Sequence, residues 1–129
     1  MGGSVAKQIR DVVEQYVKLV GSGPTEDIVD LYAPDAIVED PVGTPARQGH
    51  AAIREFYEVI AALDRATELR PEEIRIAGNQ AAFPFTLVTR AGGKRFTISP
   101  IDVMEFDDEG RITGMRAYWS QQDMRVEPE

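Results

Sequence analysis

The residues of this chain best suited to chemistry are carboxyl groups, tyrosines and basic side chains. The sequence has no cysteine, which excludes disulfides, thiolate metal sites and cysteine nucleophiles. Its one histidine, His50, cannot form a multi-histidine metal site, and we expect it to face solvent at the start of a helix. Catalysis by this chain would therefore rest mainly on proton transfer and hydrogen bonding.

Asp102 is the most informative of these residues. It lies within an alternating segment whose same-face neighbours are Phe96, Ile98, Pro100, Met104 and Phe106. Burial disfavours a charged carboxyl, so the pKa of Asp102 should rise, and the neutral acid would be a hydrogen-bond donor. The pattern also allows an aspartate paired with a backbone amide or an arginine, or a β-bulge that turns the side chain outward.

Asp40 offers a second carboxyl in a different setting. It follows the apolar segment 36–38 and precedes Pro41, which favours an extended backbone at Asp40. Its carboxylate could bond to the local backbone in a turn, or it could point into a pocket from the rim. Glu39 has the opposite parity along the chain, so we expect it to face solvent.

Three tyrosines, Tyr16, Tyr32 and Tyr57, fall on the apolar faces of predicted helices. Each one taken alone is a core tyrosine whose hydroxyl bonds to any available acceptor. If the three faced one cavity, they would form a hydroxyl network. The sequence alone does not decide between these arrangements.

The elements that would position these groups follow from hydrophobic periodicity. Helical spacing predicts three helices: one from Ser4, as its cap, to about Gly21; a short one capped by Thr25 that includes Tyr32; and one beginning near His50. Val5 is on the predicted buried stripe of the first helix. Strands are then expected over residues 74–77, 81–89 and 94–106, and in a last segment through Trp119, with turns at 78–79, 92–93 and 107–110.

Helices followed by hairpin-linked strands predict an α+β fold with an antiparallel sheet. A curved sheet with helices across its concave face would leave a pocket between the layers. We expect residues 1–129 to form a single domain. Residues 1–3 are either native or a cloning remnant, and composition does not decide which.

The composition excludes several classes of partner. The net charge is −8, which disfavours nucleic acid and anionic membrane surfaces. No apolar run approaches the roughly 20 residues that a membrane span needs. The N-terminus does not resemble a signal peptide, so we expect a cytoplasmic protein.

Several strings, in order and in register from about Val12 to Gln121, resemble bacterial ketosteroid isomerases. They are Val38-Glu39-Asp40-Pro41-Val42-Gly43, Ala52-Ile53-Arg54-Glu55-Phe56-Tyr57, Pro100-Ile101-Asp102-Val103-Met104 and Ala117-Tyr118-Trp119-Ser120. The resemblance implies a conical α+β fold of the nuclear transport factor 2-like superfamily, with SnoaL-like relatives. Three helices would pack on a curved, mixed or antiparallel sheet around an apolar pocket. It also implies a homodimer.

The resemblance further implies a steroid Δ5-isomerase and a role for each site residue. Asp40 would be the general base, Tyr16 and protonated Asp102 would form the oxyanion hole, and Tyr57 with Tyr32 would extend the hydrogen-bond network. The steroid pocket would be lined by Trp119, Phe85, Met115, Val38 and Phe56. A proton shuttle of this kind needs no cofactor and no metal. Residues 61–73 match the family least, so substrate preference could differ there.

Other enzymes of this superfamily and a non-catalytic binding protein are the alternatives. Polyketide cyclases and dehydratase-like enzymes often use a histidine with an aspartate, and only His50 is available here. Related epoxide hydrolases use an Asp-Arg-Asp set, and we expect no arginine beside Asp40 and Asp102. A module that binds apolar ligands would need Trp119, Phe85 and Met115, but not the three catalytic groups together.

Overall fold

The computed structural model describes residues 2–129, so Met1 of the possible remnant lies outside the described residues. Most of the helical structure comes first, as predicted. The helices are α1 (Gly2–Ser22), α2 (Thr25–Val29) and α3 (His50–Ala61), and two short 3-10 turns are η1 (Pro71–Glu73) and η2 (Gln121–Asp123). No helix within residues 2–129 is long and apolar enough to cross a membrane.

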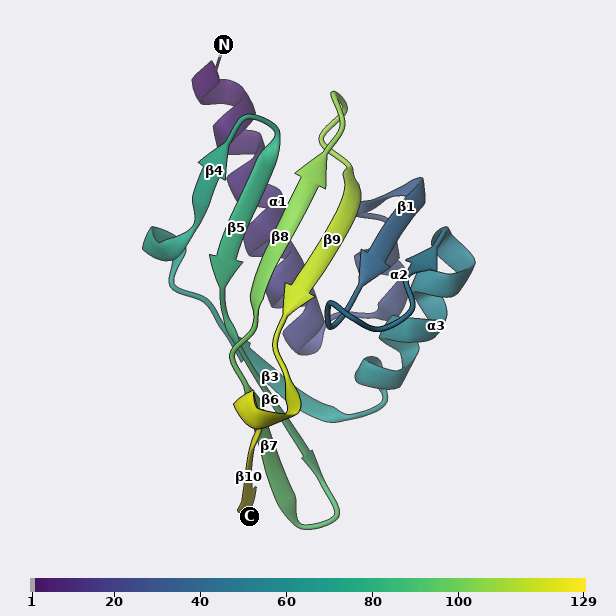
Figure 1. The fold of residues 1–129 in the computed structure, drawn as a ribbon, viewed down its shortest axis with the longest axis vertical. Helices are drawn as coiled ribbons and strands as arrows, with labels where there is room; N and C mark the ends of the chain where they lie inside the picture. Colours follow the sequence, from purple (N-terminus) through teal and green to yellow (C-terminus); the bar gives the residue numbers. More distant parts are fainter. Residues whose placement is uncertain (1) are drawn as a thin grey trace.

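The strands form two sheets that meet end to end (Figure 1). The six-stranded sheet runs in the order β2 (Arg47–Gln48), β1 (Tyr32–Glu39), β9 (Ile112–Tyr118), β8 (Ile101–Phe106), β5 (Gln80–Pro84), β4 (Arg75–Ala77). The four-stranded sheet runs in the order β10 (Arg125–Pro128), β7 (Lys94–Ile98), β6 (Thr86–Ala91), β3 (Asp64–Glu68). Only β1 and β9 pair in parallel among these strands; the other pairs are antiparallel.

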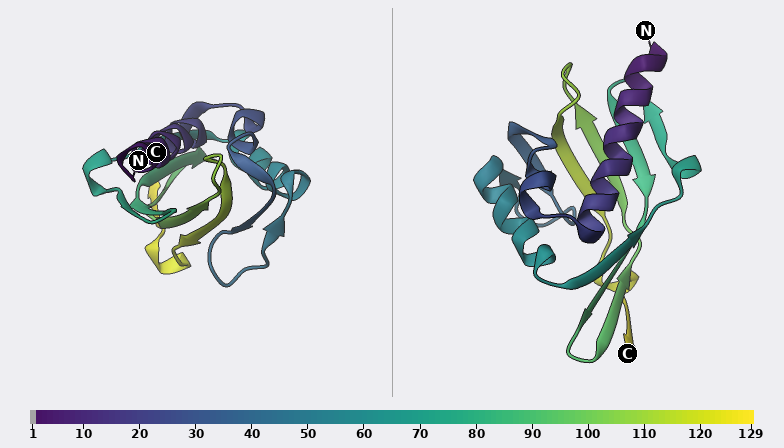
Figure 2. Two further views of the ribbon diagram at one scale, coloured as in Figure 1. Left: turned by 90° about the horizontal axis from the view of Figure 1, so that it is seen from above. Right: turned by 180° about the vertical axis from the view of Figure 1, so that it is seen from behind.

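The helices cover one face of the six-stranded sheet (Figure 2). α1 crosses this face, and α2 and α3 lie beside it over β1. Burying the apolar side of α1 against the sheet gives one core, which includes Ile9, Val13, Val17, Met104 and Ile112. Val5 is 49% exposed, so placing it on the buried stripe was wrong.

Two predicted strands are each broken in the structure. The segment 81–89 splits at Phe85 into β5 and β6, and the segment 94–106 splits at residues 99–100 into β7 and β8. Pro100 has no N–H to donate to a ladder, and its carbonyl instead accepts a hydrogen bond from the Phe85 amide at 3.3 Å. Both segments cross between the six-stranded and the four-stranded sheet at this point.

The first two helices begin differently from the prediction. α1 starts at Gly2, so Ser4 lies inside the helix and does not cap it. Pro24 precedes α2, and Thr25 is its first helical residue. Tyr32 begins β1 instead of ending α2, because the helix stops at Val29. The strands β1, β2, β3 and β10 were not predicted, whereas α3 and the turns at 78–79, 92–93 and 107–110 were.

Candidate active site

Asp102 is placed in the middle of the six-stranded sheet with its side chain toward the helices. On β8 it pairs with Phe83 of β5 and Ala117 of β9, both buried. Asp102 is itself 1% exposed, and its Oδ1 has no hydrogen-bond partner among the described residues. Asp102 is therefore not turned outward by a β-bulge, and its Oδ1 is not paired with a backbone amide or an arginine. Burial, with the negative charge of Asp40, raises the pKa of Asp102 well above its ordinary value.

The three tyrosine hydroxyls form one buried chain. The hydroxyl of Tyr57, from α3, lies 2.8 Å from that of Tyr16 on α1 and 2.7 Å from that of Tyr32 on β1. All three side chains are buried, and burial raises the pKa of each above its ordinary value. The hydroxyls are therefore neutral donors. If Tyr57 donates to Tyr16, the Tyr16 hydrogen is free for a further acceptor.

Asp40 is held by a residue 79 positions away in the sequence. The indole N–H of Trp119 donates to Asp40 Oδ1 at 2.8 Å. The contact depends on the parallel pairing of β1 with β9, in which Val38 is opposite Met115 and Glu39 opposite Arg116. Because the two strands run in the same direction, the residues that follow them emerge side by side.

The charge of Asp40 is set by opposing effects. Burial raises the pKa of its carboxyl, while the hydrogen bond from Trp119 and the positive charge of Arg47 lower it. It is Glu39 whose carboxylate bonds to the local backbone, accepting from the Gly43 amide at 3.2 Å. Asp40 instead faces a cavity, which decides between the two arrangements that the sequence allowed.

The cavity beside Asp40 has a volume of about 220 Å³ and a mostly apolar wall. Phe56 and Trp119, which we predicted to contact substrate, are part of this wall. The wall also includes residues that we did not predict: Ile60, Leu87, Thr89, Phe96, Ile98 and Met124. Phe96 and Ile98 share the parity of Asp102, which was a usable signal. Met124 follows η2, and nothing local in the sequence indicated it.

The other predicted substrate-binding residues are deeper in the protein. Val38, Met115 and Phe85 belong to the core cluster and are not part of the cavity wall. The Phe85 ring packs at a tilt against the Phe83 ring, with centroids 6.0 Å apart, and Phe83 in turn packs edge-on against the Tyr16 ring. In this structure these side chains are therefore part of the core on which the site residues pack, and they do not line the cavity.

Two expectations about basic residues were wrong. His50 is half-buried instead of solvent-facing, and its Nε2 lies 2.8 Å from the Tyr32 carbonyl oxygen. Arg47 is close enough to Asp40 for its charge to lower the pKa of that carboxyl, although we expected no arginine there. No group of three or more metal-ligating side chains occurs among the described residues.

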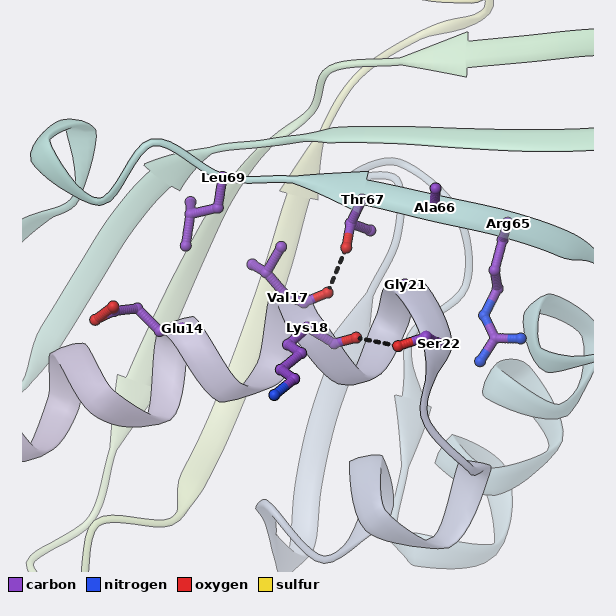
Figure 3. A pocket seen from close by; sticks show the side chains of 9 residues that line it. All are labelled: Glu14, Val17, Lys18, Gly21, Ser22, Arg65, Ala66, Thr67 and Leu69. Carbon is purple, nitrogen blue, oxygen red and sulfur yellow. Dashed lines mark hydrogen bonds between the residues drawn. The ribbon is translucent and has the colours of Figure 1, made fainter.

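A larger hollow of about 390 Å³ lies elsewhere, between α1 and β3 (Figure 3). Two of its polar side chains, Thr67 and Arg65, already bond to backbone carbonyls. Thr67 donates to the Val17 carbonyl, and Arg65 donates to the carbonyls of Val20, Gly23 and Ala61. Of these carbonyls, those of Val20 and Ala61 belong to the last turns of α1 and α3, where the helix leaves them without a partner. The hydrogen bonds around this hollow attach β3 of the four-stranded sheet to the helices.

Comparison with known proteins places these features in context. Residues 13–115 match the SnoaL-like domain family. The chain is 43% identical over 124 residues to the Steroid Delta-isomerase of Nocardioides simplex, which covers 96% of this chain and 99% of that protein. It is also 30% identical over 120 residues to Epoxide hydrolase LasB of Streptomyces lasalocidi. This match covers 88% of this chain and 42% of that protein.

Solved structures confirm the expected α+β fold. The epoxide hydrolase/cyclase-like enzyme SalBIII, which has a role in pyran ring formation in polyether salinomycin, superposes with a TM-score of 0.87 at 26% identity. The match covers 95% of this chain and 98% of that one. A Mycobacterium tuberculosis protein superposes with a TM-score of 0.84 at 22% identity, over 93% and 96% of the two chains.

Proposed function

The chain belongs to the SnoaL-like domain family and is 43% identical to a steroid Δ-isomerase, and we propose that it is a steroid Δ5-isomerase. The reaction converts 3-oxo-Δ5-steroids to 3-oxo-Δ4-steroids. One proton moves from C4 to C6 through a dienolate, so no other reactant is consumed.

The observation that carries this proposal is the contrast between buried Asp102 and half-buried Asp40. Asp40 receives a hydrogen bond from Trp119 and faces the positive charge of Arg47, which both favour its ionised form. Asp102 receives neither: its Oδ1 is buried without a partner among the described residues, and burial favours the neutral acid. One group is thus suited to accept a proton and the other to donate a hydrogen bond.

The proton transfer follows from this division. The C4 proton is acidified by the adjacent carbonyl and double bond, and Asp40 removes it. The resulting negative charge is spread onto the carbonyl oxygen, where Tyr16 and neutral Asp102 donate hydrogen bonds. Asp40 then returns the proton to C6. Donors fixed in advance in a site with little water are worth about 3–4 kcal/mol each.

The buried tyrosine chain supports the donor role of Tyr16. Its hydroxyl is held at 2.8 Å by Tyr57, which Tyr32 holds in turn at 2.7 Å. A fixed hydroxyl does not have to reorganise when the oxyanion forms, which lowers the barrier. The apolar wall around Asp40 suits a rigid hydrocarbon ring system. Proton shuttling between carbon atoms by these groups requires no cofactor.

The chain is also proposed to form a homodimer through the outer face of the six-stranded sheet. Ile37, Ile101 and Tyr118 are 45%, 50% and 46% exposed. Each alternates with a buried neighbour, so all three point away from the helices. An apolar patch on a sheet face that no helix covers is typical of an interface.

A second candidate function is epoxide opening. It is favoured by the relatives that are epoxide hydrolase or cyclase-like enzymes and by the presence of Arg47 near Asp40. In that reaction Asp102 would protonate the epoxide oxygen, and Asp40 would take a proton from the attacking hydroxyl. The greater identity to the isomerase, over nearly the whole length of both chains, makes this the second choice.

The test is absorbance of the conjugated enone after mixing the protein with 5-androstene-3,17-dione. We expect rapid growth of the band in wild type and its loss in Asp40→Asn. Binding is followed separately by quenching of Trp119, the single tryptophan of the chain. A flat absorbance trace from wild type that binds the steroid would exclude the isomerase.

A further inference from the structure

Arg47 is a cation whose side chain is directed into the protein. β2 pairs antiparallel with β1, with Arg47 opposite Val38 and Gln48 opposite Ile37. Residues that are directly opposite on paired strands share a face of the sheet. Val38 is fully buried on the inner face, whereas Ile37 is exposed. Arg47 is therefore on the same side of the sheet as the active site.

Among the described residues Arg47 makes no salt bridge, although its charge is close enough to Asp40 to lower the pKa of that carboxyl. The central carbon of the Arg47 guanidinium lies 4.5 Å from the centroid of the Phe56 ring. Its Nη1 is buried without a hydrogen bond to any of the described side chains. The aromatic face offsets only part of the cost of removing this charge from water. A guanidinium stacked by its face keeps its in-plane N–H groups available for an acceptor.

The position of Arg47 is next to the cavity that contains Asp40. Arg47 lines a groove of about 350 Å³ along α3, with Val59 beside it and Glu55 exposed at its edge. The groove and the cavity share Phe56 and Ile60. The cavity alone, about 220 Å³, is smaller than the roughly 300–1,000 Å³ of small-molecule sites. A ligand that fills it would extend past Phe56 into the groove.

We propose that Arg47 and this groove form a subsite for a carboxylate on the end of the steroid remote from the reacting carbonyl. This inference rests on the proposed function, because the carbonyl must be held at Tyr16 and Asp102 for the other end to point outward. A carboxylate matches the planar fork of a guanidinium. The subsite also offsets the net charge of −8, which would otherwise repel an acidic substrate.

The experiment compares two product-like steroids that the isomerase reaction does not consume. They are 3-oxo-4-androstene-17β-carboxylic acid and its methyl ester, which differ only in the charge at the remote end. Dissociation constants are measured by quenching of Trp119 fluorescence. We expect wild type to bind the acid about tenfold more tightly than the ester, since hydrogen bonds to charged groups are the strong ones.

Two variants isolate the contribution of Arg47. Arg47→Met keeps an apolar stem over Phe56 and removes the charge, so the preference for the acid should disappear while ester binding stays within about twofold. Arg116→Met is the matched control, because Arg116 is exposed on β9 and outside both the cavity and the groove. It should retain the preference. Arg47→Lys should retain part of it.

The outcomes separate this inference from the isomerase proposal. Equal binding of the acid and the ester by wild type overturns the subsite. This comparison does not depend on the folding of any variant. Equal weakening of both ligands by Arg47→Met also overturns it, since that result indicates packing. An acid preference that depends on Arg47 in a protein without enone formation from 5-androstene-3,17-dione would support the subsite and overturn the isomerase.

Discussion

The indole N–H of Trp119 lies 2.8 Å from Asp40 Oδ1, and this bond joins the ends of two parallel strands. It favours the ionised form of a carboxyl whose pKa is raised by burial. Trp119 also lines the cavity, so one side chain both bonds to the proposed base and is placed to contact a ligand bound there.

Trp119→Phe should therefore make Asp40 a poorer base near neutral pH. Without the bond, the pKa of Asp40 rises further, and the acid limb of the profile of kcat/KM against pH moves to higher pH. We expect a loss of about tenfold in kcat/KM at neutral pH and less at alkaline pH. A uniform loss across the pH range would mean that Trp119 acts only through packing.

Asp102→Asn should stabilise the protein increasingly as pH rises. The pKa of Asp102 is raised by folding, so above about pH 3.9 the folded state keeps a proton that the unfolded state releases. The free energy of unfolding of wild type thus falls by about 1.4 kcal/mol per pH unit up to the folded pKa, relative to Asp102→Asn.

Urea unfolding of both proteins at several pH values measures this difference. A difference that does not change with pH would show that Asp102 titrates alike in the folded and unfolded states. The same variant should lose isomerase activity, because the amide is a weaker donor to an oxyanion than the neutral acid.

Tyr57→Phe should clearly lower the free energy of unfolding but should reduce activity only moderately. It removes the central hydroxyl of the buried chain and leaves Tyr16 and Tyr32 without their partner. We expect a loss of about 1–3 kcal/mol in the free energy of unfolding. Activity should fall less than in Tyr16→Phe, where loss of a direct donor costs about 10²–10³ in kcat.

The control for Tyr57→Phe is Tyr118→Phe on the outer face of β9, which removes a hydroxyl but keeps the apolar ring that the proposed dimer interface uses. Stability and activity should both be unchanged in that variant. If Tyr57→Phe matched Tyr16→Phe in kcat, Tyr57 would itself have to contact the substrate.

Gly21→Ala should destabilise the joint between α1 and β3. An added Cβ would clash with Thr67 Oγ1 and would lie 3.1 Å from the Thr67 backbone nitrogen; Figure 3 shows Gly21 and Thr67 side by side. Moving Thr67 breaks its bond to the Val17 carbonyl. We expect thermal unfolding to show a loss of about 1–3 kcal/mol in the free energy of unfolding. The control Ser22→Ala, at the exposed next residue, should lose less than about 0.5 kcal/mol.

Ile101→Lys should disrupt the proposed dimer. Wild type should sediment at twice the chain mass of 14.3 kDa. The variant should sediment as a monomer, because a charge in an apolar interface is costly to bury. Val59→Lys, at a 68% exposed position on α3, should remain dimeric. A wild type that is monomeric at micromolar concentration would contradict the interface.

The sequence by itself determined the local arrangement of the site. Alternation around Asp102 placed a carboxyl on an apolar strand face, and helical spacing placed Tyr16 and Tyr57 on buried faces. Such periods are properties of neighbouring residues, because a strand turns its side chains every second position and a helix every 3.6. The turns at 78–79 and 92–93 were likewise predicted locally, from the pairs Gly78-Asn79 and Gly92-Gly93.

Only the tertiary structure decided which of these groups meet. The bond from Trp119 to Asp40 needs β1 and β9 to pair in parallel, and the inward direction of Arg47 needs β2 to pair with β1 in one register. Strand pairing joins segments far apart in the chain, and no local period encodes its partner or register. The surroundings that set the charges of Asp40 and Asp102 exist only once those strands are joined.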